Sequence, residues 1–139
     1  MAPPRSDLDQ LLADAESHLR VGSVAEMAGA LTRSHLPDFR CVGWYGDPPA
    51  GWTIVIDAEY AGAEPPAPLV TRFGAADFWE RWTRAECLCK LADVPMLAWW
   101  PRHGLDVPAG FTGVWRTLRL PADADRPELV VSVAAAPSY

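Results

Sequence analysis

The sequence predicts an α+β domain with helices packed against a mostly antiparallel sheet of five or six strands. Two observations carry this prediction. Apolar residues recur at helical spacing near the N-terminus and again in the middle of the chain. The segments between and after these stretches alternate with the two-residue period of strands. This order is typical of an α+β fold, and 139 residues are consistent with a single domain spanning residues 1–139.

The first helix is expected after a disordered leader at residues 1–5. Ser6 begins it, and Asp9 three positions later comes close to a capping box. Apolar residues then repeat at helical spacing, and Gly22 is a natural end for the helix. A second helix is predicted from Ser23 to His35, because the four residues from Ser23 match the capping-box pattern in full.

The chain then changes to the period of a strand. Residues 39–45 alternate, and Trp52 to Tyr60 is the clearest strand of the sequence. One face of that strand is apolar, whereas the other carries Asp57 and Glu59. The segment 46–51, rich in proline and glycine, is expected to join the two strands as a hairpin.

The second half of the chain is expected to hold one helix and several short strands. A proline-rich surface loop is expected at residues 61–68, followed by a short strand from Leu69 to Phe73. An apolar stripe predicts the third, central helix at about Ala75 to Leu91. Three more strands complete the chain: Met96 to Trp100, Phe111 to Leu120 and Glu128 to Ala134.

The predicted order of elements resembles, in topology alone, that of the cone-shaped NTF2-like domains. No residue motif accompanies the resemblance. In those domains helices pack against a curved sheet around a central pocket, so the resemblance implies an enclosed pocket here. It is the alternative to a plain layered α+β domain.

Composition narrows the classes of partner. The net charge is −6, and the eleven arginines are scattered rather than clustered. A nucleic-acid binder needs a concentrated positive surface, so no nucleic-acid partner is expected. No apolar run approaches the roughly 18 residues of a membrane helix, so no membrane partner is expected either. Three cysteines and the lack of a signal-peptide pattern favour the cytoplasm. A homodimer is compatible with these features.

Seven tryptophans in so short a chain indicate either a very aromatic core or a binding pocket walled by indoles. Trp52 and Trp82 are expected in the core, because each lies on the apolar face of its element. Adjacent strand residues face opposite sides, so Trp99 and Trp100 cannot share one face of a strand. The expected ligand-binding residues are Trp44, Trp100, Trp115 and Tyr60.

Three polar residues are candidates for catalysis. Asp57 and Glu59 share a strand face, and a carboxylate pair in an apolar cleft has a raised pKa suited to acid–base work. Arg116 lies among apolar residues on a predicted strand and needs an anionic partner, either Asp57 or a ligand. His103 lies in a predicted loop directly after a strand. A solvent-exposed position is the alternative for each of the three.

Two functions are consistent with these features. The first is a small-molecule binding domain with a Trp-lined apolar pocket, and such a domain could also be a biosynthetic enzyme without a cofactor, of the cyclase, isomerase or hydratase type. The second is an acidic protein-interaction module, such as an inhibitor, an immunity-type protein or an accessory subunit. No motif for a catalytic nucleophile, a phosphate loop or a dinucleotide is present. Whether the protein is an enzyme is therefore left open, and no metal or cofactor is expected.

Overall fold

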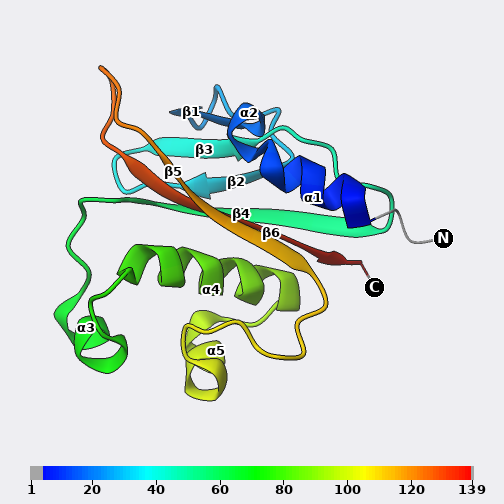
Figure 1. Cartoon of the computed structure of the whole chain (residues 1–139). Coiled ribbons are helices and arrows are strands. Elements are labelled where there is room, and N and C mark those ends of the chain that lie inside the picture. The colour runs from blue at the N-terminus through cyan, green and yellow to red at the C-terminus, as the bar shows by residue number, and fades with distance from the viewer. Residues whose placement is uncertain (1–4, 139) are drawn as a thin grey trace.

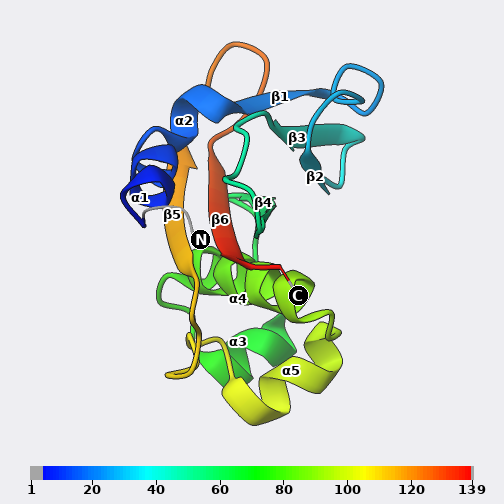
Figure 2. The same ribbon diagram turned by 90° about the vertical axis from the view of Figure 1, so that its right-hand side faces the viewer.

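The computed structural model describes residues 5–138 and arranges them in three layers (Figure 1). A three-stranded sheet forms the middle layer, three helices cover one of its faces, and a second three-stranded sheet with two N-terminal helices covers the other. Figure 2 shows the same layers from the side. Of the expected leader, residues 1–4 lie outside the described residues, and the fifth residue already begins helix α1 (Arg5–Ala13).

The middle sheet has the antiparallel order β4-β6-β5. Its strands are β4 (Trp52–Tyr60), β5 (Val114–Leu120) and β6 (Leu129–Pro137). β4 and β6 are both nine residues long and pair over their whole length, from Trp52 opposite Pro137 to Tyr60 opposite Leu129. β6 is therefore the central strand and is buried over most of its length, which fits its nearly continuous apolar sequence.

Helix α4 (Phe78–Ala92) lies across one face of this sheet. A chain of hydroxyl groups joins the two layers, because Ser132 Oγ lies 2.7 Å from both Thr83 Oγ1 and Thr117 Oγ1. Buried hydroxyl groups need such partners, and these three satisfy one another. Helices α3 (Ala67–Phe73) and α5 (Met96–His103) pack on the outer side of α4.

The other face of the middle sheet is covered by a sheet of order β1-β3-β2 and by α1 and α2 (Ala15–His18). Its strands are β1 (Leu19–Ser23), β2 (Thr32–His35) and β3 (Arg40–Trp44). The main hydrophobic core lies between the two sheets and α1. Trp44 is its largest fully buried side chain, and the indole Nε1 donates to the carbonyl oxygen of Gly46 at 2.6 Å.

The α+β class is confirmed, and residues 5–138 form six strands, although these make two sheets of three rather than one. The strand Trp52–Tyr60, the central helix and the last two strands lie where they were predicted. The predicted hairpin around residues 46–51 is wrong: β3 pairs with β1 and β2, whereas β4 pairs with β6. The segment 46–51 instead crosses from one sheet to the other. With two separate sheets, the NTF2-like alternative gains no support.

The predicted second helix, Ser23 to His35, is also wrong. The capping-box bonds do form, since Ser23 N–H donates to Glu26 Oε1 and Glu26 N–H donates to Ser23 Oγ. They close a turn after β1 rather than begin a helix. The buried residue of β2, Ser34, lies between exposed neighbours, as in a strand. Antiparallel pairing with β3 supplies the backbone hydrogen bonds of this segment.

Two segments predicted as strands are helices. Residues 69–73 belong to α3, and residues 96–100 belong to α5. Each helix follows a proline at its N-cap, Pro66 and Pro95, where the missing N–H costs nothing. The Met, Leu, Ala and Trp residues of α5 tolerate a helix well, so short apolar runs of this kind do not distinguish the two structures.

Candidate functional site

The structure does not bring the predicted site residues together. They lie on different layers, and most have structural partners within the chain. The seven residues are Asp57, Arg116 and His103, predicted as catalytic, and Trp44, Trp100, Trp115 and Tyr60, predicted as ligand-binding. Most of them support the fold through contacts within the chain, whereas Tyr60 contacts a turn that borders a surface groove.

Asp57 lies between β4 and α4 and forms an ion pair with Lys90 at 3.0 Å. Burial raises the pKa of Asp57, although Lys90 and Ser34 oppose this rise. On the same strand face, the pKa of Glu59 is raised to about 7, first by burial and then by the charges of Asp57 and Glu86. The carboxylate pair thus has the raised pKa values that suit acid–base work, but α4 covers it.

Arg116 and His103 have other partners. The Arg116 guanidinium donates to the carbonyl oxygens of Leu12 and Ala13, at 2.7 and 2.8 Å, and so completes the C-terminal end of α1. His103 is the last residue of α5, and its exposed ring lies 4.5 Å from the ring of Trp99, centroid to centroid. Neither of the two contacts Asp57.

The predicted tryptophans also have different environments. Trp44 is fully buried in the core between the sheets, so it cannot bind a ligand there. Trp100 packs against Trp82 and Phe73 in the aromatic cluster of the helical layer. Trp115 is 40% exposed, and the Arg84 guanidinium lies over its ring at 4.8 Å. A single Trp-lined pocket does not form from these residues.

Tyr60 is the predicted residue that leads to a surface site. Its hydroxyl donates to Asp38 Oδ2 at 2.6 Å, and Arg40 Nη1 lies 3.5 Å from the same hydroxyl. Asp38 lies in the turn between β2 and β3, and Arg40 is the first residue of β3. Leu36 N–H closes this turn by donating to the carbonyl oxygen of Arg40. Tyr60 therefore holds this turn against the end of the middle sheet.

Phe39 occupies the strained position of that turn. Its φ of 69° is left-handed, a conformation that costs a residue with a Cβ roughly 1–2 kcal/mol. Three-residue hairpin loops usually place glycine there. The phenyl ring is also 90% exposed, the highest exposed fraction of any large hydrophobic side chain in the described part of the chain. Two unfavourable features coincide at Phe39, and such strain is characteristic of functional positions.

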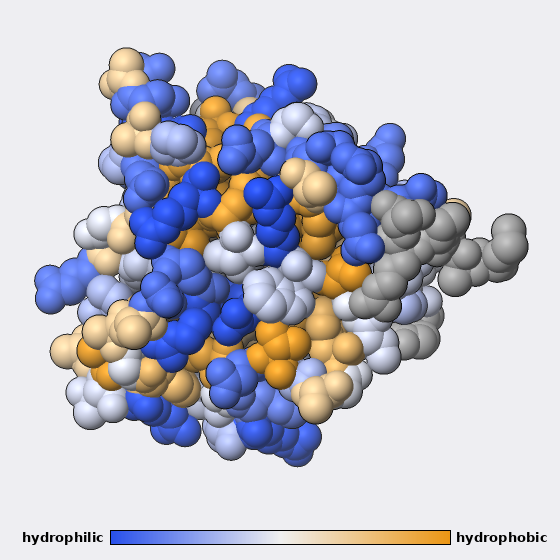
Figure 3. All heavy atoms as spheres, viewed as in Figure 1, coloured by the Kyte–Doolittle hydropathy of each residue, from blue (hydrophilic) through white to orange (hydrophobic). Residues whose placement is uncertain are grey.

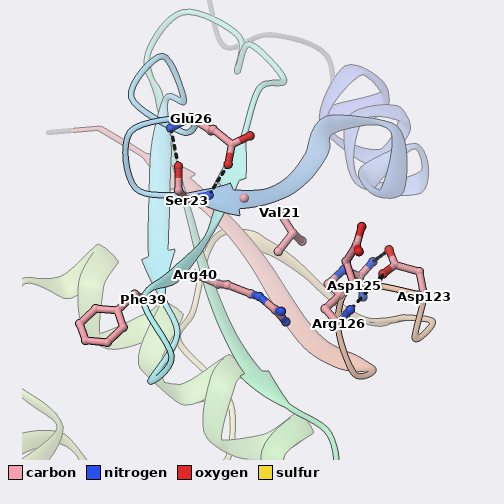
Figure 4. Close-up of a pocket in the computed structure, with 9 residues that line it drawn as sticks. Val21, Ser23, Glu26, Phe39, Arg40, Asp123, Asp125 and Arg126 are labelled. Carbon is pink, nitrogen blue, oxygen red and sulfur yellow. Dashed lines mark hydrogen bonds and ion pairs between the residues drawn. The ribbon is translucent and has the colours of Figure 1, made fainter.

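Phe39 and Arg40 line a groove of 440 Å³ beside β1 (Figure 4). Three segments far apart in the sequence form its walls: the end of β1 with its turn, the β2–β3 turn, and the loop between β5 and β6. In Figure 4 the Arg40 side chain extends from its strand toward the loop that carries Arg126 and the acids. The lining residues are Val21, Gly22, Ser23, Glu26, Phe39, Arg40, Asp123, Asp125 and Arg126.

Charged groups of both signs surround this groove. Backbone N–H groups of Asp125 and Arg126 donate to Asp123 Oδ1 and keep the pKa of that carboxyl low. Bonds from Ser23 likewise lower the pKa of Glu26, so both carboxylates are ionised near neutral pH. The Arg126 guanidinium donates to two carbonyl groups of its own loop. Arg40 Nη1 also lies 3.7 Å from Asp38 Oδ2, and Arg126 Nη2 lies 3.7 Å from Asp123 Oδ2. Three carboxylates and two guanidinium groups thus line the groove, and both guanidinium groups already have acidic partners within the chain.

None of the residues that line this groove is among the site residues predicted from the sequence. Pro37 and Asp38 are turn-forming residues and could have marked the β2–β3 turn. Nothing local distinguishes Phe39 from an ordinary core phenylalanine. The groove exists because three sheet connections meet, and no single segment carries a signal for it.

Two further observations concern metal binding and membrane-spanning helices. Among residues 5–138, no group of three or more His, Cys, Asp or Glu side chains is arranged to hold a metal ion. None of the helices in that range is long and apolar enough to cross a membrane. On the face shown in Figure 3, hydrophilic residues break up the hydrophobic surface.

Comparison with known proteins identifies no relative. No family model, no curated protein and no solved structure matches the chain.

Proposed function

We propose that this protein is a protein-interaction module, of the inhibitor, immunity-protein or accessory-subunit kind, that binds a segment of a partner protein in the groove beside β1. One observation carries the proposal: Phe39 is both strained, with a φ of 69°, and 90% exposed at the rim of the groove. Aromatic side chains are enriched among the residues that dominate interface affinity. Burying this ring against a partner would recover the free energy that its exposure costs the free protein.

The shape and charge of the groove favour a polypeptide partner. Its walls come from three connections and combine a backbone edge with charges of both signs, and the Phe39 ring projects outward beside them (Figure 4). Small-molecule sites are mostly apolar and bury most of their ligand, whereas interface rims are polar. The net charge of −6 would also attract a basic partner and speed its association.

The proposal is tested by replacing Phe39 with the photo-cross-linking residue p-benzoylphenylalanine in cells that naturally express the protein. Leu97 is the matched control, because it is also apolar and 73% exposed but lies on α5. Irradiation is expected to yield a discrete protein adduct from position 39 that position 97 does not give. The same adducts from both positions, or no protein adduct from position 39, would overturn the proposal.

A second candidate, small-molecule binding, is favoured by a smaller pocket on α5. This pocket of 290 Å³ combines an apolar wall with two basic side chains, and its lining is Val94, Ala98, Trp99, Arg102 and His103. The indole Nε1–H of Trp99 is buried and has no acceptor among the described residues. A buried donor without an acceptor costs about 1–3 kcal/mol, which a ligand carboxylate would relieve once the exposed His103 ring turns aside.

Calorimetric titration with benzoate tests this second candidate. Trp99→Phe keeps an aromatic ring but removes the N–H, whereas Trp100→Phe makes the same change in the neighbouring aromatic cluster. Benzoate is expected to bind the native protein and Trp100→Phe and to bind Trp99→Phe at least about fivefold more weakly, the effect of one hydrogen bond. Equal binding to all three, or binding to none, excludes a carboxylate site at Trp99.

A further inference from the structure

The outer edge of β1 is an incompletely satisfied strand edge. Tyr45 N–H donates to the carbonyl oxygen of His18, which fixes the alternation of hydrogen bonds between β1 and β3. The backbone groups of Arg20 and Gly22 then face β3. Those of Leu19, Val21 and Ser23 point away from it, toward the free edge of the sheet.

Local groups close this edge on both sides of Val21. Leu19 N–H donates to the carbonyl oxygen of Glu16, and Ser23 N–H donates to Glu26 Oε1 at 2.8 Å. The N–H and C=O of Val21 have no such partner among the described residues. Proteins usually block free strand edges, and here the block has a gap of one residue.

This gap opens into the groove. Val21, Gly22 and Ser23 are consecutive and all line it, although side chains of successive strand residues point to opposite faces. The strand therefore contributes its backbone edge to the groove. Figure 4 shows Val21 between the Ser23–Glu26 turn on one side and the loop that carries Asp123 and Asp125 on the other.

The charges near the gap favour a basic occupant. Asp125 is exposed on the wall next to Val21, and the Asp123 carboxyl keeps a low pKa beside it. A second copy of this chain would bring another net charge of −6, so pairing between two copies is opposed by repulsion. A basic segment is attracted by the same acids.

We propose that the partner enters the groove as an extended, basic segment that pairs with β1 at Val21. Val21 N–H donates to a carbonyl group of the segment, and Val21 C=O accepts an N–H from it, as in β-strand addition. A lysine or arginine next to the paired residue reaches Asp125. This inference rests on the proposed interaction function and specifies how the same groove recognises its partner.

The test uses the ¹⁵N-labelled full chain and the peptide acetyl-Lys-Val-Lys-Val-Lys-amide, followed by NMR. The peptide is expected to shift the Val21 amide resonance and to slow its hydrogen exchange. Each valine of the peptide is flanked by lysines, so N-methylation of both valines removes the backbone donor of the paired residue and should weaken binding about fivefold, as should replacement of the lysines by glutamates. Equal affinity for the N-methylated peptide or for the glutamate peptide, or no shift at Val21 with any peptide, overturns the inference.

Two variants test the protein side. Val21→Pro removes the N–H at an edge position, where proline is tolerated, and should weaken peptide binding about fivefold. Val21→Thr keeps the N–H and the β-branched side chain and should bind like the native protein. If Val21→Pro fails to fold, the N-methylated peptide still decides the question.

The outcomes separate this inference from the proposed function. A partner adduct at position 39 combined with full peptide binding by a folded Val21→Pro overturns edge pairing and leaves the interaction function intact. Edge pairing with the basic peptide but no protein adduct at position 39 overturns the interaction function alone.

Discussion

Lys90 Nζ lies 3.0 Å from Asp57 Oδ1 and also donates to the carbonyl oxygen of Ile56 at 2.8 Å. Asp57 Oδ1 lies 3.4 Å from Ser34 Oγ, which in turn accepts the N–H of Ala58 at 3.0 Å. This single ion pair therefore connects all three layers: β2 through Ser34, β4 through Asp57, and α4 through Lys90. The residue predicted as a catalytic acid thus joins the layers of the fold.

Lys90→Met should lower the free energy of unfolding by about 2 kcal/mol, because it leaves the buried Asp57 carboxylate without its cation. Asp57→Asn together with Lys90→Met should cost less than the sum of the two single changes. Urea denaturation of all four proteins measures this coupling. The exposed ion pairs of Arg119 provide the control, and Arg119→Met should cost clearly less than Lys90→Met, because solvent screens these pairs. Additive effects of the two changes would show that the pair is not coupled.

The titration of Glu59 should lower the free energy of unfolding as the pH rises toward neutrality. Its pKa is raised from 4.5 to about 7 in the folded chain, so between these values the folded state holds a proton that the unfolded state has lost. The free energy of unfolding then falls as the pH rises from about 4.5 to about 7. Burial and the charges of Asp57 and Glu86 are the physical causes.

Glu59→Gln removes this titration and should leave the protein more stable than the native chain at pH 8 and little changed at pH 5. Denaturation curves at the two pH values measure the difference. Glu64→Gln, on an exposed loop, is the matched control and should behave like the native protein at both. An equal effect of Glu59→Gln at pH 5 and pH 8 would contradict the raised pKa.

Phe39→Gly should raise the free energy of unfolding by about 1 kcal/mol, because glycine adopts the left-handed conformation without a steric cost. Phe39→Ala removes the exposed ring but keeps the strain, so it should give no such gain. Thermal denaturation of both variants measures the effect. Under the proposed function, both variants lose the partner although one of them is more stable. Loss of stability in Phe39→Gly would mean that the ring supports the fold.

Gly113→Ala should destabilise the protein by more than about 2 kcal/mol. A Cβ at this position would clash with the carbonyl oxygen of Ala135 on β6. The clash is costly because backbone atoms cannot move aside as a flexible side chain can. Gly110 lies three residues earlier and has open space around it, so Gly110→Ala should be tolerated. Similar denaturation midpoints for the two variants would show that β5 and β6 can separate locally at little cost.

Strong local patterns predicted part of this fold correctly. β4, α4 and the last two strands were placed because each has a clear apolar period over seven or more residues. Short or ambiguous segments were misassigned. Residues 96–100 suit a strand or a helix equally well, and the Ser23–Glu26 pair closes the same hydrogen bonds in a turn as at a helix start.

The candidate site could not be predicted in the same way. Its walls come from residues 21–26, 39–40 and 123–126, and none of these segments carries a chemical motif of its own. Asp57 was predicted as one of a pair of carboxylates on a strand face, and Arg116 as a charge among apolar residues. Their partners, Lys90 and the end of α1, lie 33 and about 100 positions away in the chain.

The sequence by itself determined the α+β class, the strongest strand and helix, and the acidic net charge, because these depend on local period and composition. Only the tertiary structure decided which strands pair, that Trp44 is core, and that Phe39 is strained at the rim of a groove. The physical reason is that strand pairing and burial are contacts between segments distant in the chain. A residue's neighbours in sequence therefore do not determine whether its side chain is a structural partner or a free group facing a ligand.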